Sequence, residues 1–139
     1  MSLELLTQHI TGLPGISQLE SSGYTFYFYG DEQVLPFVTY TASDHEYDRM
    51  SGLDREGVYR VNIGIAKTSF DKLFPQPDKV WDYTALNCFM PHPHYAAQHF
   101  ICILNPEGTL LAETLALIEE AYTIAKGRFE RKQARQNKL

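Results

Sequence analysis

The stretch VYRVNIGIA, residues 58–66, decides the fold because its two sets of alternate positions carry different kinds of side chain. One set is apolar throughout: Tyr59, Val61, Ile63 and Ile65. The other set places Arg60 beside Asn62. Successive side chains of a β-strand point to opposite faces of a sheet. The pattern therefore predicts a strand with one face in the core and with a cation next to an amide on the opposite face.

The residues before this strand predict a helix, a hairpin and a long loop. Apolar residues at helical spacing, bounded by Ser2 and by a Gly/Pro cluster, predict a helix over residues 3–12. Aromatic and β-branched residues then predict a hairpin of two strands, residues 24–29 and 35–41. Residues 42–57 are acidic and punctuated by glycine, which predicts a loop of a length that is often functional.

The residues after the strand predict two more helices and one more strand. Thr68 and Asp71 resemble a capping box at the start of a short helix, which Pro75 ends before a linker over residues 75–79. An irregular aromatic segment leads to a buried strand over residues 99–104. Asn105 and Pro106 then predict the start of a long amphipathic helix.

This order of elements, α-β-β-β-α-β-α, predicts an α+β fold. Strands joined by hairpins, with helices at both chain ends, form an antiparallel sheet packed on one face by the N- and C-terminal helices. The length of 139 residues, with 44% hydrophobic and 13% aromatic residues, suits one folded domain over residues 1–139.

The charge is unevenly distributed along the chain. The net charge is −5, but residues 126–139 alone carry about +5, which leaves residues 1–125 at −10. An acidic body repels phosphate backbones, so we do not expect duplex DNA as a partner, and nucleic acid is left to the basic tail.

The remaining composition bears on location. We find neither a secretory leader in the first residues nor an apolar run of about 20 residues, so we expect a cytoplasmic, bacterial-type protein with no membrane partner. Cys88 and Cys102 both lie among apolar residues, which is typical of reduced core thiols.

Two groups of residues are candidates for a site. The segment His92-Pro93-His94-Tyr95 has a His-x-His spacing, and a third ligand from His99, His45 or Asp44 would complete a divalent metal site. The alternative is a rigid surface loop with solvated histidines.

The second group is the pair Arg60 and Asn62, preceded by Asp54 and Arg55. A guanidinium beside an amide on a rigid strand can bind a carboxylate, a phosphate or a carbonyl group. The alternative is structural: Arg60 would pair with Asp54 or Glu56 and hold the long loop in place.

The sequence also resembles known families. SGLDREGVYRVNIGIAK and DYTALNCFMPHPHYAAQHFICILNP resemble motifs of a bacterial family of unknown function. The order of elements is more distantly similar to that of the MmcQ/YjbR-like proteins, which have a CyaY-like fold. The resemblance implies a compact sheet with both terminal helices on one face. It also implies DNA binding, from the YjbR-like group, or iron binding, from the CyaY group.

We expect a binding or accessory domain rather than an enzyme. Its site would lie between Arg60 and Asn62, the loop over residues 44–55 and the His92–Tyr95 segment, and would take a small molecule or a protein. No motif predicts a cofactor. Two alternatives stay open: a small metal-assisted or acid/base enzyme using His92 and His94, and a weak nucleic-acid binder using the basic tail. A further candidate is an apolar groove suited to a small molecule or to a homodimer interface, lined by Tyr24, Tyr27, Tyr29, Tyr40 and Tyr59. The alternative is ordinary packing of these tyrosines under the long loops.

Overall fold

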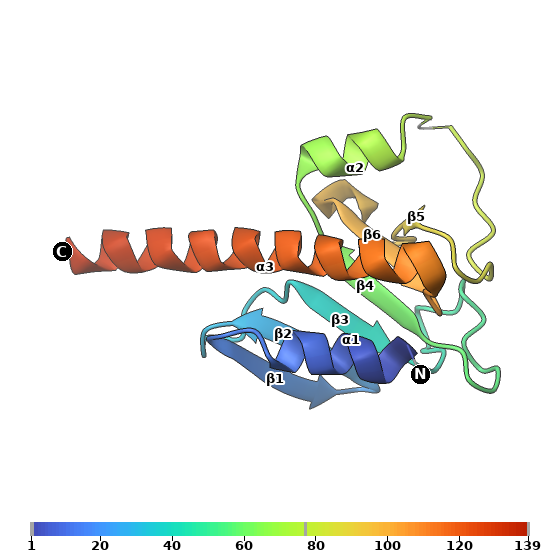
Figure 1. The fold of residues 1–139 in the computed structure, drawn as a ribbon, viewed down its shortest axis with the longest axis horizontal. Helices are drawn as coiled ribbons and strands as arrows, with labels where there is room; N and C mark the ends of the chain where they lie inside the picture. The colour runs from blue at the N-terminus through green and yellow to red at the C-terminus, as the bar shows by residue number, and fades with distance from the viewer. Residues whose placement is uncertain (1, 77, 139) are drawn as a thin grey trace.

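The computed structural model describes residues 2–76 and 78–138. Met1, Pro77 in the predicted linker and Leu139 at the end of the basic tail lie outside the described residues. The fold is α+β, as predicted: a six-stranded antiparallel sheet with its helices as a second layer (Figure 1). The strand order is β1-β2-β3-β4-β6-β5.

The strands and helices have the following bounds. The strands are β1 (Ile16–Ser21), β2 (Tyr24–Tyr29), β3 (Val38–Thr41), β4 (Arg60–Gly64), β5 (Met90–Pro91) and β6 (Phe100–Leu104). The helices are α1 (Ser2–Thr11), α2 (Lys67–Leu73), the 3-10 turn η1 (Ala96–Gln98) and α3 (Gly108–Asn137).

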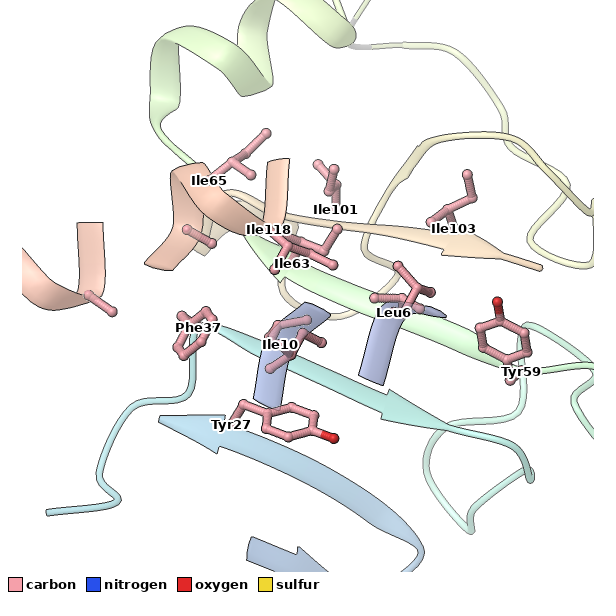
Figure 2. Packing of buried hydrophobic residues seen from close by; sticks show 14 residues of the cluster. Leu6, Ile10, Tyr27, Phe37, Tyr59, Ile63, Ile65, Ile101, Ile103 and Ile118 are labelled. Atoms are coloured by element: carbon pink, nitrogen blue, oxygen red, sulfur yellow. The ribbon is translucent and has the colours of Figure 1, made fainter. Parts of the chain in front are cut away.

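Strand β4 lies in the interior of the sheet, between β3 and β6, and its apolar set is in the core as predicted. Val61, Ile63 and the flanking Tyr59 and Ile65 are 0–5% exposed. They pack with residues of α1 and α3, which confirms that the two terminal helices cover one face of the sheet (Figure 2). Leu6 and Ile10 come from α1, and Ile118, Ala121 and Ala125 come from α3.

The predicted element order lacked two strands, β1 and β5. Strand β1 pairs with β2 along its whole length, but its sequence ISQLES has four exposed residues in six, so it shows little alternation. The turn between the two strands is tight because Ser22 and Gly23 both have positive φ angles. Strand β5 spans two residues, too few to leave a periodic signal.

Both predicted helix starts after β4 were also wrong. At α2, Asp71 pairs with Lys67 at 2.6 Å, and the helix N-terminus is bound by Glu120 of α3, which accepts from the Ala66 N–H at 3.0 Å and from Ser69 Oγ at 2.8 Å. At α3 the helix begins at Gly108, after Glu107 as N-cap. At α2, a residue distant in sequence thus replaces the predicted local cap.

Asn105 does not cap α3 as predicted but bonds to the backbone at the start of β4. It adopts a left-handed φ of 45°. Its side chain accepts from the Tyr59 N–H at 2.9 Å and donates to the Gly57 carbonyl at 2.7 Å. These two bonds join the end of β6 to the start of β4.

Helix α3 has 30 residues and is therefore about 45 Å long, so its C-terminal part extends past the sheet (Figure 1). In its C-terminal half, α3 contacts the turn after β2. The Phe129 ring lies over Gly30, where a Cβ atom would come within 2.5 Å of the ring. Lys132 pairs with Glu32 of the same turn at 2.7 Å.

Truncation of the helix layer tests the position of the core. Ile118 is fully buried, so Ile118→Ala should lower the free energy of unfolding by about 2–5 kcal/mol through lost apolar burial and the cavity left behind. Leu5 on α1 is 51% exposed, so Leu5→Ala should cost less than about 1 kcal/mol. Urea unfolding measures both values, and equal costs would contradict this packing.

Candidate functional site

The sheet face opposite the helices carries a row of polar side chains. Thr39 of β3, Asn62 of β4 and Cys102 of β6 are neighbours in the strand register, and Arg60 lies one alternate position earlier on β4. The Asn62 amide donates to Thr39 Oγ1 at 2.9 Å and its carbonyl accepts from Arg60 Nε at 2.8 Å. The Asn62 amide thus links the Arg60 guanidinium to the Thr39 hydroxyl.

Arg60 is completely buried, and the long loop supplies its counter-ion. Asp48 accepts from the two terminal nitrogens of Arg60 at 2.9 and 2.5 Å, a bidentate ion pair. Ser51 Oγ accepts a further bond from Arg60 at 3.0 Å. An unpaired buried guanidinium would be very costly, so this pairing holds the loop on the sheet.

Asp48 collects further donors besides Arg60. The Tyr24 hydroxyl of β2 donates to Asp48 Oδ2, and His94 Nε2 lies 3.6 Å from Asp48 Oδ1. Although burial opposes ionisation, the bonds from Arg60 and Tyr24 hold the pKa of Asp48 well below its ordinary value. Burial, followed by the bond to Asp48, raises the pKa of Tyr24. Asp48 is therefore a carboxylate, and Tyr24 is a neutral donor.

His45 supports Tyr24 from the other side. Its ring stacks on the Tyr24 ring with 4.3 Å between centroids, and its Nε2 is 2.8 Å from Thr41 Oγ1. His45 and Asp48 also pair their backbones in an isolated β-bridge. The loop between β3 and β4 is therefore ordered around the ion pair.

His92 is buried at the end of β5, and its Nδ1 caps the following turn. The backbone N–H groups of His94 and Tyr95 donate to Nδ1 at 3.0 and 3.1 Å. A nitrogen that accepts these bonds carries no proton, so the neutral ring holds its proton on Nε2. Burial first, and then the charge of Arg60, lowers the pKa of His92 to about 3. The ring is therefore neutral at physiological pH.

Of these groups, Tyr24, Asp48 and His92 line a pocket of about 470 Å³. Thr39, Asn62 and Phe100 line it from the sheet, and Tyr24 and Phe26 line it from β2. Asp48, His92, Tyr95 and Gln98 come from the two loops, and Leu35 and Pro36 from the segment before β3. The pocket is thus largely aromatic and aliphatic, with a polar end beside the Arg60–Asp48 pair.

A comparison with known protein families identifies the family. Residues 1–134 match the model of a family of unknown function, DUF6194. The chain belongs to DUF6194. No curated protein and no solved structure matches it, so the likeness to YjbR-like proteins stays a prediction.

The predicted site residues of this DUF6194 chain fall into two groups. Arg60, Asn62 and His92 are all 0–4% exposed and lie around the polar end of the pocket, and Tyr95 forms part of its wall. His94 is close to Asp48, with its side chain 37% exposed, and does not line this pocket. Arg60 itself is covered by Asp48 and Ser51. The pocket is therefore lined by Asp48 and Asn62, which bond to Arg60, and not by the guanidinium.

Asp54 and Arg55 lie elsewhere and hold the loop together. Asp54 accepts from the Asp44 N–H at 3.0 Å, and Arg55 donates to three backbone carbonyls, those of Ser51, Gly52 and Thr84. The predicted pairing of Arg60 with Asp54 or Glu56 was wrong, because Asp48 takes that place. The ion pair that holds the long loop on the sheet is therefore formed by Arg60 with Asp48.

The metal alternative finds no assembled ligand set. Across residues 2–76 and 78–138, no three His, Cys, Asp or Glu side chains gather closely enough to hold an ion. Asp44 accepts from the Leu53 N–H at 2.8 Å, and His99 packs against Phe70 with 5.6 Å between ring centroids. Both of these proposed third ligands thus contact other residues instead of forming a ligand set.

Tyr24, one of the tyrosines predicted for a ligand groove, lines the pocket, whereas Phe26, Thr39, Asp48 and Phe100 were not predicted as parts of the site. Alternation along β2 places Tyr24 and Phe26 on the same face, and the register sets Phe26 opposite Thr39 and Thr39 opposite Asn62. Only the strand pairing links Phe26 and Thr39 to Asn62 and Arg60. In the loop, nothing in the sequence distinguishes Asp48 from Asp44 or Asp54.

Removal of the buried cation tests the role of the ion pair. Arg60→Met should lower the free energy of unfolding by about 3–5 kcal/mol because Asp48 would remain buried without its counter-ion. The double variant Arg60→Met/Asp48→Leu should recover part of that loss, since no lone charge remains. Arg55→Met, an exposed control, should cost less than about 1.5 kcal/mol. Equal losses in all three variants by urea unfolding would refute this role.

The pH dependence of stability tests the state of His92. The folded-state pKa of about 3 lies below the unfolded-state value of about 6.5. Between these values His92 binds a proton in the unfolded chain but not in the fold. The contribution of His92 to the free energy of unfolding is therefore fully present above pH ~6.5 and is lost as the pH falls below that value. The slope from His92 is at most about 1.4 kcal/mol per pH unit. Asp48 adds its own loss only below its ordinary value of about 3.9.

His92→Asn isolates this contribution. The Asn side-chain oxygen can replace Nδ1 as acceptor for the two backbone N–H groups, but it does not titrate. Urea unfolding from pH 7.5 to 4.5 should therefore show a shallower dependence in His92→Asn than in the unchanged protein. Parallel curves would mean that His92 is not held neutral in the fold.

Proposed function

We propose that this DUF6194 domain binds a small organic molecule in the pocket on the sheet face opposite the helices. The observation that carries the proposal is the pocket itself: about 470 Å³, aromatic along its walls, with a fixed polar end. Ligand sites in proteins typically have about 300–1,000 Å³ and a few convergent polar groups in a largely apolar lining.

The state of the polar groups favours binding over catalysis. A general base needs a free lone pair within reach of its substrate. The carboxylate of Asp48 already accepts from Arg60 and Tyr24, and Nδ1 of His92 accepts from two backbone N–H groups. These groups are suited to holding the pocket walls in position. They are less suited to moving protons.

The construction of the pocket favours a ligand site that is formed before binding. Its floor is the sheet, and both loops that wall it are bonded to Asp48 or to the His92 turn. A rigid pocket loses little conformational entropy when a ligand enters. We place this binding in the cytoplasm, and the free thiols of Cys88 and Cys102 support a reducing compartment. Over residues 2–76 and 78–138, no helix has the length and hydropathy to cross a bilayer.

An uncharged fluorescent probe tests the proposal. N-phenyl-1-naphthylamine, whose emission rises in apolar surroundings, should bind with a Kd of roughly 10–200 µM, given its size. Tyr95 lines the pocket and is 57% exposed, so Tyr95→Ala should weaken binding by about threefold or more without affecting folding. Tyr47→Ala, which removes a tyrosine that is 85% exposed outside this pocket, is the matched control.

Two results would contradict this function. One is the absence of any fluorescence change in the unchanged protein. The other is an equal effect of the Tyr95 and Tyr47 variants, which would place the probe on the general surface rather than in the pocket.

A further inference from the structure

The lining of the pocket, taken together with Arg60 behind it, carries no net charge. Asp48 and His92 are its only acid and imidazole residues among the described lining residues. Asp48 is neutralised by the bidentate bond from Arg60, whose guanidinium lies directly behind it. His92 is neutral because two backbone N–H groups point at Nδ1. A charged ligand would therefore lose its hydration without meeting a compensating charge.

His92 leaves a hydrogen-bond donor at the polar end open to a ligand. With Nδ1 occupied, the proton of His92 is on Nε2, and within residues 2–76 and 78–138 no acceptor bonds to it. The residue is 96% buried and lines the pocket, being 4% exposed. Nε2 of His92 is not among the fully buried polar atoms without a partner in the described residues, so it is open to the pocket. A ligand acceptor there would replace water as its partner.

The walls indicate the shape of the ligand. Tyr24, Phe26, Tyr95 and Phe100 all contribute rings to the lining. Aromatic side chains pack best against flat ring systems, face to face with an offset or edge to face. Leu35 and Pro36 add aliphatic surface to the lining.

We propose that the pocket selects an uncharged, planar, largely apolar molecule whose single hydrogen-bond acceptor, such as a ketone or amide carbonyl, accepts from Nε2 of His92. This inference rests on the proposed function, since it names the ligand class of the same pocket. It excludes organic anions and cations of the same size as good ligands.

A panel of matched naphthalenes separates the inference from the proposed function. The compounds are 2-acetylnaphthalene, which has a neutral carbonyl, 2-naphthoate, an anion, and 2-naphthylmethylammonium, a cation. Each competes with N-phenyl-1-naphthylamine for the full chain at pH 7.5. The ketone should displace the probe at a concentration at least about tenfold lower than either ion.

A histidine variant assigns the donor. His92→Asn keeps an acceptor for the turn but loses Nε2–H, so the ketone should bind about five- to tenfold more weakly. N-phenyl-1-naphthylamine has no carbonyl acceptor, so its loss of affinity measures the packing change alone. The ratio of the two losses is the readout, and Tyr47→Ala should leave both affinities unchanged.

Each outcome decides one statement. Stronger binding of the ketone, together with a selective loss in His92→Asn, supports the inference. Equal or stronger binding of either ion would overturn the selection for uncharged ligands and leave small-molecule binding intact. An equal loss of ketone and probe in His92→Asn would remove His92 as the donor. No binding of the probe or of any naphthalene would overturn the proposed function and the inference with it.

Discussion

The buried ion pair between Arg60 and Asp48 is the constraint on which the rest of the site depends. A guanidinium on an interior strand, fully removed from water, requires a counter-ion at close range. The loop between β3 and β4 supplies that counter-ion, and with it come Ser51 and the contact to Tyr24. The position of an otherwise irregular loop is thereby set by the charge of one strand residue.

The two faces of the sheet are stabilised in different ways. On the helix face, burial of aliphatic side chains from α1 and α3 provides a conventional core. On the other face, the row Thr39, Asn62 and Arg60 is satisfied by hydrogen bonds, and loops replace helices as its cover. Hydrogen bonds fix the directions of the side chains that form them. The polar network on this face therefore holds its residues in place around the pocket.

Local patterns predicted the elements well, and long-range pairing accounts for most of what they missed. The alternation of residues 58–66 gave both faces of β4 correctly because it depends only on neighbours in the chain. The partner of Arg60, the cap of α2 by Glu120 and the junction made by Asn105 all join residues distant in sequence. Alternation gives the face on which a side chain lies, but it does not tell which residue lies opposite. The residues that line the pocket from β2, β3 and β4 are therefore brought together by the register of these strands, which the sequence pattern does not contain.

The two edges of the sheet differ in their capacity to accept another strand. On one side, β5 has two residues, and Pro91 has no N–H to donate to an incoming chain. On the other side, β1 offers six residues in regular antiparallel pairing, with the charged Glu20 near its end. Prolines, charges and very short edge strands are the usual protection against uncontrolled sheet extension. Self-association by strand addition is thus blocked at β5, and any sheet-to-sheet growth of this domain would have to proceed through the backbone of β1.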